Sequence, residues 1–398
     1  NTMTSQLSRE PPAINLASSL STFSTINSFV LHEIKHNSLL TMREIRHKIK
    51  ITDRTKTGRS YLNYAVRYGK FELVKGLVEM GASLSIKSHC DWNILHDAAF
   101  FNRFEIAQWI LSEMSGSWQL CVGQDKFGNT PIHMACRRGH REIARLMVEE
   151  MQRREIAKLP KNCMSHTWLH SAIHSKMQDI VQLLLLVKED KPEQKKRSLW
   201  LLSGVDAFLT SPLQQCCLHP HDEMLPSISL MLQCVEGYVP DKRHVHKIIT
   251  YLDETKSNCI QYCFASTSID SCIALMEFYA KYAAQFLSPS EMMELNPLTQ
   301  QNVFGFTVLH IACRFQQMDM LRKFLLEYRP SKELRELYLA IDTNVKDVTG
   351  KPPILIATQR HREEAQSIFD SFEERKRRGF LDCNEATVLG THDDLVGV

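Results

Sequence analysis

The sequence lacks the features of membrane, secreted and nucleic-acid-binding proteins. Its longest apolar runs, such as residues 180–187, are far shorter than the roughly 20 residues of a membrane-spanning helix. Residues 1–20 contain no basic start followed by an apolar run, so they do not resemble a signal peptide. The formal net charge is only +3, whereas a nucleic-acid-binding domain needs a strongly basic face. We therefore expect neither a membrane span nor a nucleic-acid partner.

Common enzyme signatures are absent as well. The sequence contains no G-x-S-x-G, G-x-G-x-x-G, Walker A or protein-kinase motif. No nucleophile–base pair can be placed in space from the sequence either. We therefore predict that the chain is not an enzyme, and that it has no catalytic residues and no cofactor.

One enzyme-like motif is present at residues 32–36, which read His-Glu-Ile-Lys-His. It matches H-E-x-x-H, a pattern that places two imidazoles on one face of a helix with a glutamate as general base. However, Lys35 brings a charge where such helices are usually apolar, and no G-x-x-H continuation follows. We therefore interpret these residues as a structural helix, and expect that His32 and His36 hold no catalytic metal.

Twelve cysteines are scattered along the chain, many of them inside apolar helical patterns. This arrangement favours free, mostly buried thiols in a reducing compartment over a disulfide framework. The group Cys216, Cys217, His219 and His221 offers soft and imidazole ligands. Because structural zinc sites usually use two clean ligand pairs, we expect no metal here either.

A short pattern recurs along most of the chain. Residues 125–147 show it most clearly, with D-K-F-G-N-T-P-I-H-M-A followed by G-H and a second apolar segment. The units follow one another at intervals of 33 to 49 residues. Each unit has a small residue at the end of the pattern, and these residues are Ala65, Ala98, Ala135, Ala172, Cys216, Cys263, Ala312 and Ala357.

Each part of the pattern has a physical role in a pair of helices. Serine or threonine at its start can accept a backbone N–H bond as a helix N-cap, and proline is tolerated in the first turn that follows. The second segment has apolar residues three and four apart, as in Leu73, Val74 and Leu77. One helix pair cannot bury this stripe alone, whereas stacked pairs can.

The pattern resembles the ankyrin repeat, which has a period of 33 residues. The resemblance implies an all-α solenoid of about eight repeats, with an N-terminal capping repeat and with extra residues looping out between the later units. It also implies that the histidine of the motif hydrogen-bonds the backbone of a neighbouring turn rather than a metal. The histidines at this position are His96, His133, His170 and His310.

This interpretation divides the chain into six segments. We predict a flexible segment over 1–26, a helical cap over 27–54, regular repeats over 55–187, a charged loop over 188–200, divergent repeats with long loops over 201–370 and a polar tail over 371–398. Within the tail, the basic cluster 375–378 is either a nuclear-import patch or, as we favour, a solvated basic helix end.

The resemblance also locates a binding surface, because ankyrin arrays bind along a concave face of turn tips and first-helix residues. Outward positions are rich in aromatic and arginine side chains, which are enriched at interaction hot spots. The alternative is that individual residues pack over the turns as core. The predicted partner-binding residues are Tyr64, Arg67, Tyr68, Trp92, Asp97, Phe100, Phe101, Phe127, Met134, Arg137, Arg138, Phe304, Arg314 and Phe315.

We therefore expect a non-catalytic interaction scaffold or adaptor, in the cytoplasm or nucleus, that binds a protein or peptide on its concave face. Two alternatives stay open. The chain could be the targeting part of an effector or enzyme, with chemistry in the long loops or in a missing region. It could also be the cytosolic ankyrin domain of a membrane channel.

Overall fold

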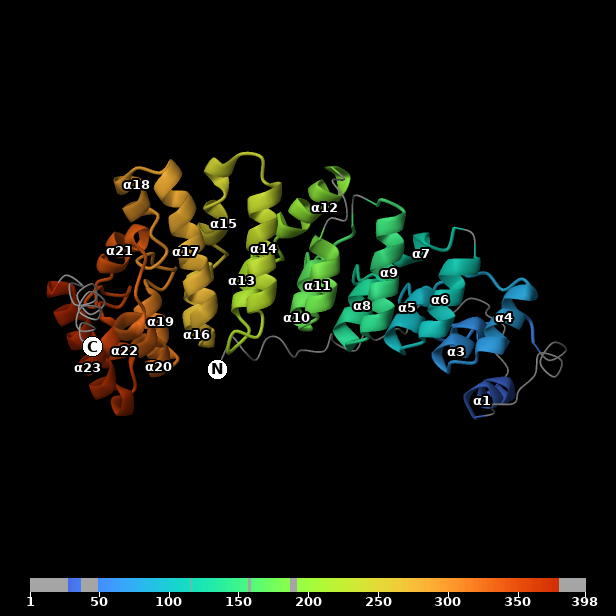
Figure 1. Cartoon of the computed structure of the whole chain (residues 1–398). Coiled ribbons are helices and arrows are strands. Elements are labelled where there is room, and N and C mark those ends of the chain that lie inside the picture. The colour runs from blue at the N-terminus through green and yellow to red at the C-terminus, as the bar shows by residue number, and fades with distance from the viewer. Residues whose placement is uncertain (1–27, 37–48, 115, 157–158, 187–191, 379–398) are drawn as a thin grey trace, which may run out of the picture.

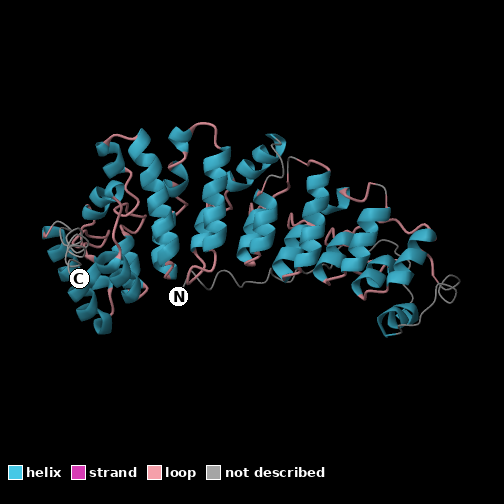
Figure 2. Ribbon diagram, viewed as in Figure 1, coloured by secondary structure: helices cyan, strands magenta, loops and turns pink. Residues whose placement is uncertain are grey.

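The computed structural model describes residues 28–36, 49–114, 116–156, 159–186 and 192–378. Every named element within these ranges is a helix, apart from an isolated antiparallel bridge between Arg54 and Ser60 (Figure 2). The helices form pairs that stack side by side into an arched array, with α3 near one end and α23 near the other (Figure 1). The predicted all-helical architecture is therefore confirmed for this part of the chain.

The first helix of each pair begins where the sequence pattern predicts. These helices are α3 (Tyr61–Arg67), α5 (Ile94–Phe100), α8 (Pro131–Arg138), α10 (Trp168–His174), α13 (Pro212–Cys217), α16 (Cys259–Ser266), α19 (Val308–Arg314) and α22 (Pro353–Ile356). All but α22 carry a capping box, in which the side chain of the N-cap residue and that of the third helical residue each accept the other's backbone N–H. Sequence-local chemistry thus fixes the start of every first helix except α22.

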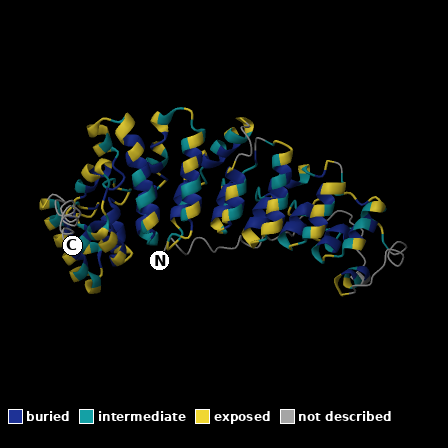
Figure 3. Ribbon diagram, viewed as in Figure 1, coloured by how far each residue is buried: buried dark blue, intermediate teal, exposed yellow. Residues whose placement is uncertain are grey.

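The second helix of each pair returns along the first. These helices are α4 (Phe71–Glu79), α6 (Phe104–Glu113), α9 (Arg141–Arg153), α11 (Gln178–Leu185), α14 (Leu225–Tyr238), α17 (Ile269–Phe286), α20 (Met318–Arg322), which continues as the π-helical turn η2 (Lys323–Glu327), and α23 (Gln359–Arg377). Their apolar stripes are buried against neighbouring helices (Figure 3), as the spacing of the apolar residues predicts. The small Ala65 and Ala98 of the first helices are fully buried, which permits close helix packing.

The prediction that extra residues loop out in the second half is wrong. They instead lengthen α14 and α17 to 14 and 18 residues, compared with 9 in α4. They also form additional helices, because the inserted segments carry apolar residues that pack onto the array. The additional helices are α12 (Pro192–Ser203), η1 (Lys242–His244), α15 (Lys247–Thr250), α18 (Pro289–Glu294) and α21 (Lys332–Leu339), beside α7 (Gln119–Val122) in the first half.

Two predicted boundaries also need correction. The charged loop predicted over 188–200 is helical from residue 192, because Leu201 and Leu202 bury one side of α12. The polar tail predicted from 371 instead continues α23 to Arg377, where Phe372 is fully buried. The predicted cap contains α1 (Ser28–His36), which packs on α3. The predicted segment 1–26 and the tail beyond 378 lie outside the described residues.

The turn before each first helix has one repeated conformation, and we call these turns fingers. The fingers are residues 55–59, 88–92, 125–129, 162–166, 206–210, 253–257, 302–306 and 347–351. The fourth residue of each finger has a positive φ, which favours glycine, as at Gly128 with φ 72°. A Cβ on Gly128 would also lie 2.9 Å from Cα of Asn162 in the next finger. Consecutive fingers are joined by a backbone hydrogen bond, such as that from Cys163 N–H to Phe127 C=O at 2.8 Å.

A side chain in the first turn joins one pair to the next finger in six of the eight first helices, α5, α8, α10, α13, α16 and α19. His133 Nδ1 accepts the backbone N–H of Thr130 at 3.1 Å, and its Nε2 lies 3.1 Å from the carbonyl oxygen of His166. A carbonyl only accepts, so Nε2 carries the proton and the imidazole is neutral. The corresponding contacts of the other motif residues are His96 to Asn129, His170 to Thr210, Gln214 to Ser257, Gln261 to Phe306 and His310 to Lys351. The predicted backbone-binding role of the motif histidines is confirmed.

This arrangement predicts acid sensitivity. Burial lowers the pKa of His133 to about 4, from an ordinary value near 6.5. The stability that depends on neutral His133 is therefore complete above pH 6.5 and is lost as the pH falls towards 4. Between pH 7 and 5 this loss is about 2 kcal/mol. His133→Gln should lose that much less stability on acidification, because Gln214 and Gln261 make the same contacts without titrating.

Urea denaturation followed by circular dichroism at pH 7 and pH 5 measures this difference. His133→Leu is the matched control, since it removes both hydrogen bonds and should cost about 2 kcal/mol or more at pH 7. Equal acid destabilisation of the wild type and His133→Gln would contradict the assignment.

Candidate protein-binding surface

The last residue of each first helix and its neighbour form one line across the first three pairs. We call Arg67, Tyr68, Phe100, Phe101, Arg137 and Arg138 the arginine–aromatic row. All six are half-buried or exposed, whereas most preceding residues of the same helices are buried. They line up because α3, α5 and α8 pack directly against one another. Arginine also suits the C-terminus of a helix, where the helix dipole is negative.

Stacking contacts connect this row from one helix pair to the next. The guanidinium carbon of Arg67 lies 4.6 Å from the ring centre of Phe101, which is 4.9 Å from that of Phe100. Arg138 in turn lies 3.7 Å from the ring centre of Phe100. These distances are within the range of cation–π interaction. The contacts hold two long, otherwise mobile arginine side chains in place.

Trp92 and Tyr64 flank the row and are both half-buried. The ring of Trp92 lies 5.1 Å from that of Phe100, and Arg59 lies 5.6 Å from the Trp92 ring centre. Tyr64 stacks on Tyr68 at 6.4 Å. Trp92 therefore supports the row by packing and also exposes part of its own surface.

Two predicted binding residues are not on the surface. Asp97 is fully buried and Met134 is 5% exposed. Both directly follow the motif histidine, and at this helical position the side chain turns into the stack. Asp97 accepts a hydrogen bond of 2.8 Å from the side-chain amide of Asn63 on the preceding pair. The prediction that these two positions face outward is wrong.

The remaining predicted residues lie apart from the row. Phe127 is half-buried in the third finger, whereas Phe304, Arg314 and Phe315 are exposed around α19. The helices α10, α13 and α16 separate α19 from α8 along the array (Figure 1). The structure therefore divides the predicted surface into two groups.

Several exposed apolar side chains on finger tips were missed by the sequence reasoning. Phe208 and Leu209 in the fifth finger are 51% and 47% exposed, and Leu209 has a positive φ of 60°. Aligning the second to fourth finger positions of all units would have revealed them as apolar residues in turns. The other members of this group are Met164, Val303 and Val348.

Asp97 has an unusual environment for a carboxylate. Burial raises its pKa to about 6, an effect that nearby Arg59 and the Asn63 hydrogen bond partly offset. Arg59 Nε is 3.9 Å from Asp97 Oδ1, too far for a direct hydrogen bond. Asn63 occupies the position that histidine or glutamine holds in later pairs. Its shorter side chain binds Asp97, rather than the carbonyl of the next finger.

The candidate metal residues do not form a ligand cluster. His32 and His36 lie close together on α1, with ring centres 4.6 Å apart, and both are exposed. Cys216 and Cys217 are buried, and burial raises the pKa of both thiols. In the ranges that the structure describes, no three histidine, cysteine, aspartate or glutamate side chains are arranged to hold a metal ion.

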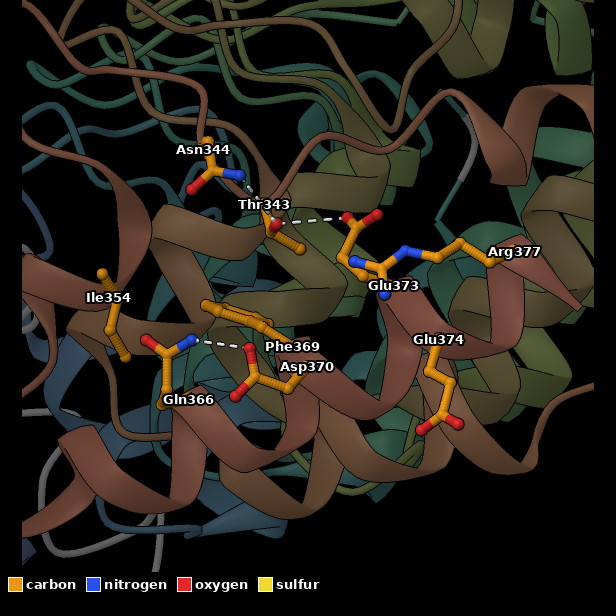
Figure 4. Close-up of a pocket in the computed structure, with 9 residues that line it drawn as sticks. All are labelled: Thr343, Asn344, Ile354, Gln366, Phe369, Asp370, Glu373, Glu374 and Arg377. Atoms are coloured by element: carbon orange, nitrogen blue, oxygen red, sulfur yellow. Dashed lines mark hydrogen bonds between the residues drawn. The ribbon is translucent and has the colours of Figure 1, made fainter.

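A pocket lies at the other end of the array, between the start of α22 and the side of α23 (Figure 4). Its lining is mainly polar and its side chains bind one another: Gln366 donates to Asp370 at 2.8 Å and Thr343 donates to Glu373 at 3.1 Å. None of the predicted binding residues lines this pocket. We therefore place the candidate site on the arginine–aromatic row.

Comparison with known proteins agrees with the repeat pattern. The family model described as "Ankyrin repeats (3 copies)" matches residues 30–117 and 95–198. The human transient receptor potential cation channel subfamily A member 1 is 30% identical over 111 residues, which are 28% of this chain and 10% of that protein. The match thus spans about a tenth of that relative.

None of the helices in the described part of the chain has the length and apolar character needed to cross a bilayer.

The buried Asp97 generates a second pH prediction, opposite in sign to that of His133. Its folded-state pKa of about 6 exceeds the ordinary 3.8, so its contribution is most favourable below pH 3.8 and is lost as the pH rises through 6. Asp97→Asn should therefore gain about 2 kcal/mol relative to the wild type between pH 4.5 and 7.5. Urea denaturation at both pH values measures this, with the exposed Asp319→Asn as control. A pH-independent difference would show that Asp97 is ionised throughout.

Proposed function

Because residues 30–198 of this chain carry ankyrin repeats, we propose that it is a non-catalytic scaffold or adaptor that binds a protein or peptide. We propose further that the helix pairs beyond residue 198 are divergent repeats of the same kind, giving about eight repeats in all. The cytoplasm or nucleus is the location consistent with this role and with free cysteines.

The arginine–aromatic row is the observation that supports this proposal. Tyrosine and arginine are among the residues that most often dominate binding energy, particularly where neighbouring groups hold them in place. Phe100 and Phe101 offer apolar area, while Arg67 and Arg138 are immobilised over their rings. Preorganised side chains lose less conformational entropy when a partner binds. The face on which the row lies would be the concave binding face expected of ankyrin arrays.

The basic cluster 375–378 supports a structural role more than a nuclear-import signal. Arg375 donates hydrogen bonds to the carbonyls of Leu325 and Tyr328, at 2.7 and 2.8 Å. Lys376 donates to the carbonyl of Ile341 at 2.8 Å. Two of the four basic residues therefore bind α23 to the end of η2 and to the turn after α21, and an import receptor would have to break these bonds.

The second candidate function is that of a channel's cytosolic ankyrin domain. It is favoured by the similarity to the human transient receptor potential cation channel over 111 residues. Sequencing the full parent transcript decides between the two. Membrane-spanning segments encoded after residue 398 would support the channel, and an open reading frame without them would support the adaptor.

The main test is a double substitution, Phe101→Ala with Arg138→Ala. Each anchor of this kind typically contributes about 2 kcal/mol, so the partner should bind at least about thirtyfold more weakly. The partner is first identified by affinity purification with mass spectrometry, and affinities are then measured by titration calorimetry. Thermal melts of each variant show whether the fold is intact.

Arg314→Ala with Phe315→Ala is the matched control, because it removes the same two residue types from α19. This variant should bind as the wild type does. If the row variant binds with unchanged affinity while the α19 variant fails, the main contact lies in the second half. If the row variant loses binding and melts at a much lower temperature, packing explains the loss.

A further inference from the structure

The charges on the first helices are strongly asymmetric. In the described chain, α3, α5, α8, α10, α13, α16, α19 and α22 together carry one carboxylate. That carboxylate is Asp97, which is fully buried. The same helices carry four arginines, which are Arg67, Arg137, Arg138 and Arg314. The surface formed by the first helices is therefore cationic although the chain as a whole is nearly neutral, with three of the four arginines in the row.

The arginines of the row also differ from those of the second helices in their partners. On α9, Arg141 and Arg145 both bind Asp179 of the next pair, at 2.7 and 3.1 Å. Among the described residues, Arg67 and Arg138 instead make their close side-chain contacts with aromatic rings. An aromatic ring contacts the flat face of a guanidinium. The N–H donors on the edge of the guanidinium therefore stay available for a carboxylate.

The distances within the row limit the spacing of the groups it can bind. The contacts from Arg67 through Phe101 and Phe100 to Arg138 place the two guanidinium carbons at most about 13 Å apart. An extended peptide advances roughly 3.3 Å per residue, so two carboxylates that bind both arginines would lie at most about four residues apart. The phenylalanines between the arginines would then meet the side chain midway between the carboxylates, which favours an apolar one.

We propose that the arginine–aromatic row binds an extended acidic peptide, with two carboxylate side chains at most about four residues apart and an apolar side chain between them. This rests on the proposed scaffold function and names the chemistry of its partner. A nucleic acid fits less well, because α10, α13 and α16 carry no lysine or arginine to continue the contact with a long polyanion.

A random dodecapeptide library displayed on phage tests this directly. The whole chain is used as bait. Peptides that also bind the double variant Arg67→Glu with Arg138→Glu are removed. The remaining peptides should be enriched in pairs of aspartate or glutamate at most about four residues apart. A synthetic peptide of the consensus sequence should bind the double variant at least about thirtyfold more weakly in calorimetry. It should also bind several-fold more weakly at 0.5 M than at 0.05 M salt.

Arg335→Glu with Arg360→Glu is the matched control, since both residues are exposed, lie at the far end of the array and change the net charge equally. This variant should bind the peptide within about twofold of the wild type. Arg67→Lys with Arg138→Lys should give an intermediate loss, because lysine keeps the charge but lacks the planar fork. Circular dichroism verifies that each variant is folded.

Each other outcome contradicts a defined claim. Row-dependent peptides that are neutral or basic would overturn the acidic partner but leave the scaffold function intact. A twelve-nucleotide single-stranded DNA that binds more tightly than any selected peptide would assign the row to nucleic acid. If no enriched peptide depends on the row, both the acidic partner and the row's role as a peptide-binding site fail.

Discussion

In α5, α8, α10, α13, α16 and α19, the side chain at the third residue of the helix connects one helix pair to the next. It accepts the N–H of its own N-cap residue, and it donates to the last carbonyl of the following finger. The N-cap N–H is a buried backbone donor that would otherwise lack a partner, at a cost of about 1 to 3 kcal/mol, whereas the finger carbonyl also accepts the N–H of the first residue of its finger. The contact joins residues 33 apart from His96 and 45 apart from Gln261. Longer units therefore place their extra residues in the second helix and between it and the next finger, where α12, α15 and α18 occur along the chain.

This constraint also creates the surface that we assign to binding. This contact fixes α5 relative to α8, and the Asn63–Asp97 hydrogen bond fixes α3 relative to α5, so the C-terminal ends of the three helices lie side by side as well. Arginine and phenylalanine at these ends can then stack across three pairs. At the beginning of the array, Asn63 is too short to make the connection, and the buried Asp97 takes its amide instead. The short side chain of Asn63 thus explains both the missing contact with the next finger and the hydrogen bond to the buried carboxylate of Asp97.

The sequence predicts the local features of the fold well. Cap residues, the motif histidine and the small residues of the first helices each act over a few residues, so Thr130, His133 and Ala135 could be assigned before the structure. It predicts tertiary features less well. The burial of Asp97 depends on Asn63 in the preceding pair, and the helical state of residues 192–203 depends on packing against α14. The exposed tips at Phe208 and Leu209 were missed because they belong to turns, where apolar residues carry no helical periodicity.

The central claim is that a partner covers the row at the ends of α3, α5 and α8. Hydroxyl-radical footprinting of the purified complex measures this most directly, because it reports the solvent exposure of individual aromatic side chains. The account predicts that binding strongly reduces the oxidation of Tyr68, Phe100 and Phe101, while Phe208 and Phe304 are oxidised as in the free chain. Protection of Phe208 and Phe304 without protection of Phe100 and Phe101 would contradict it.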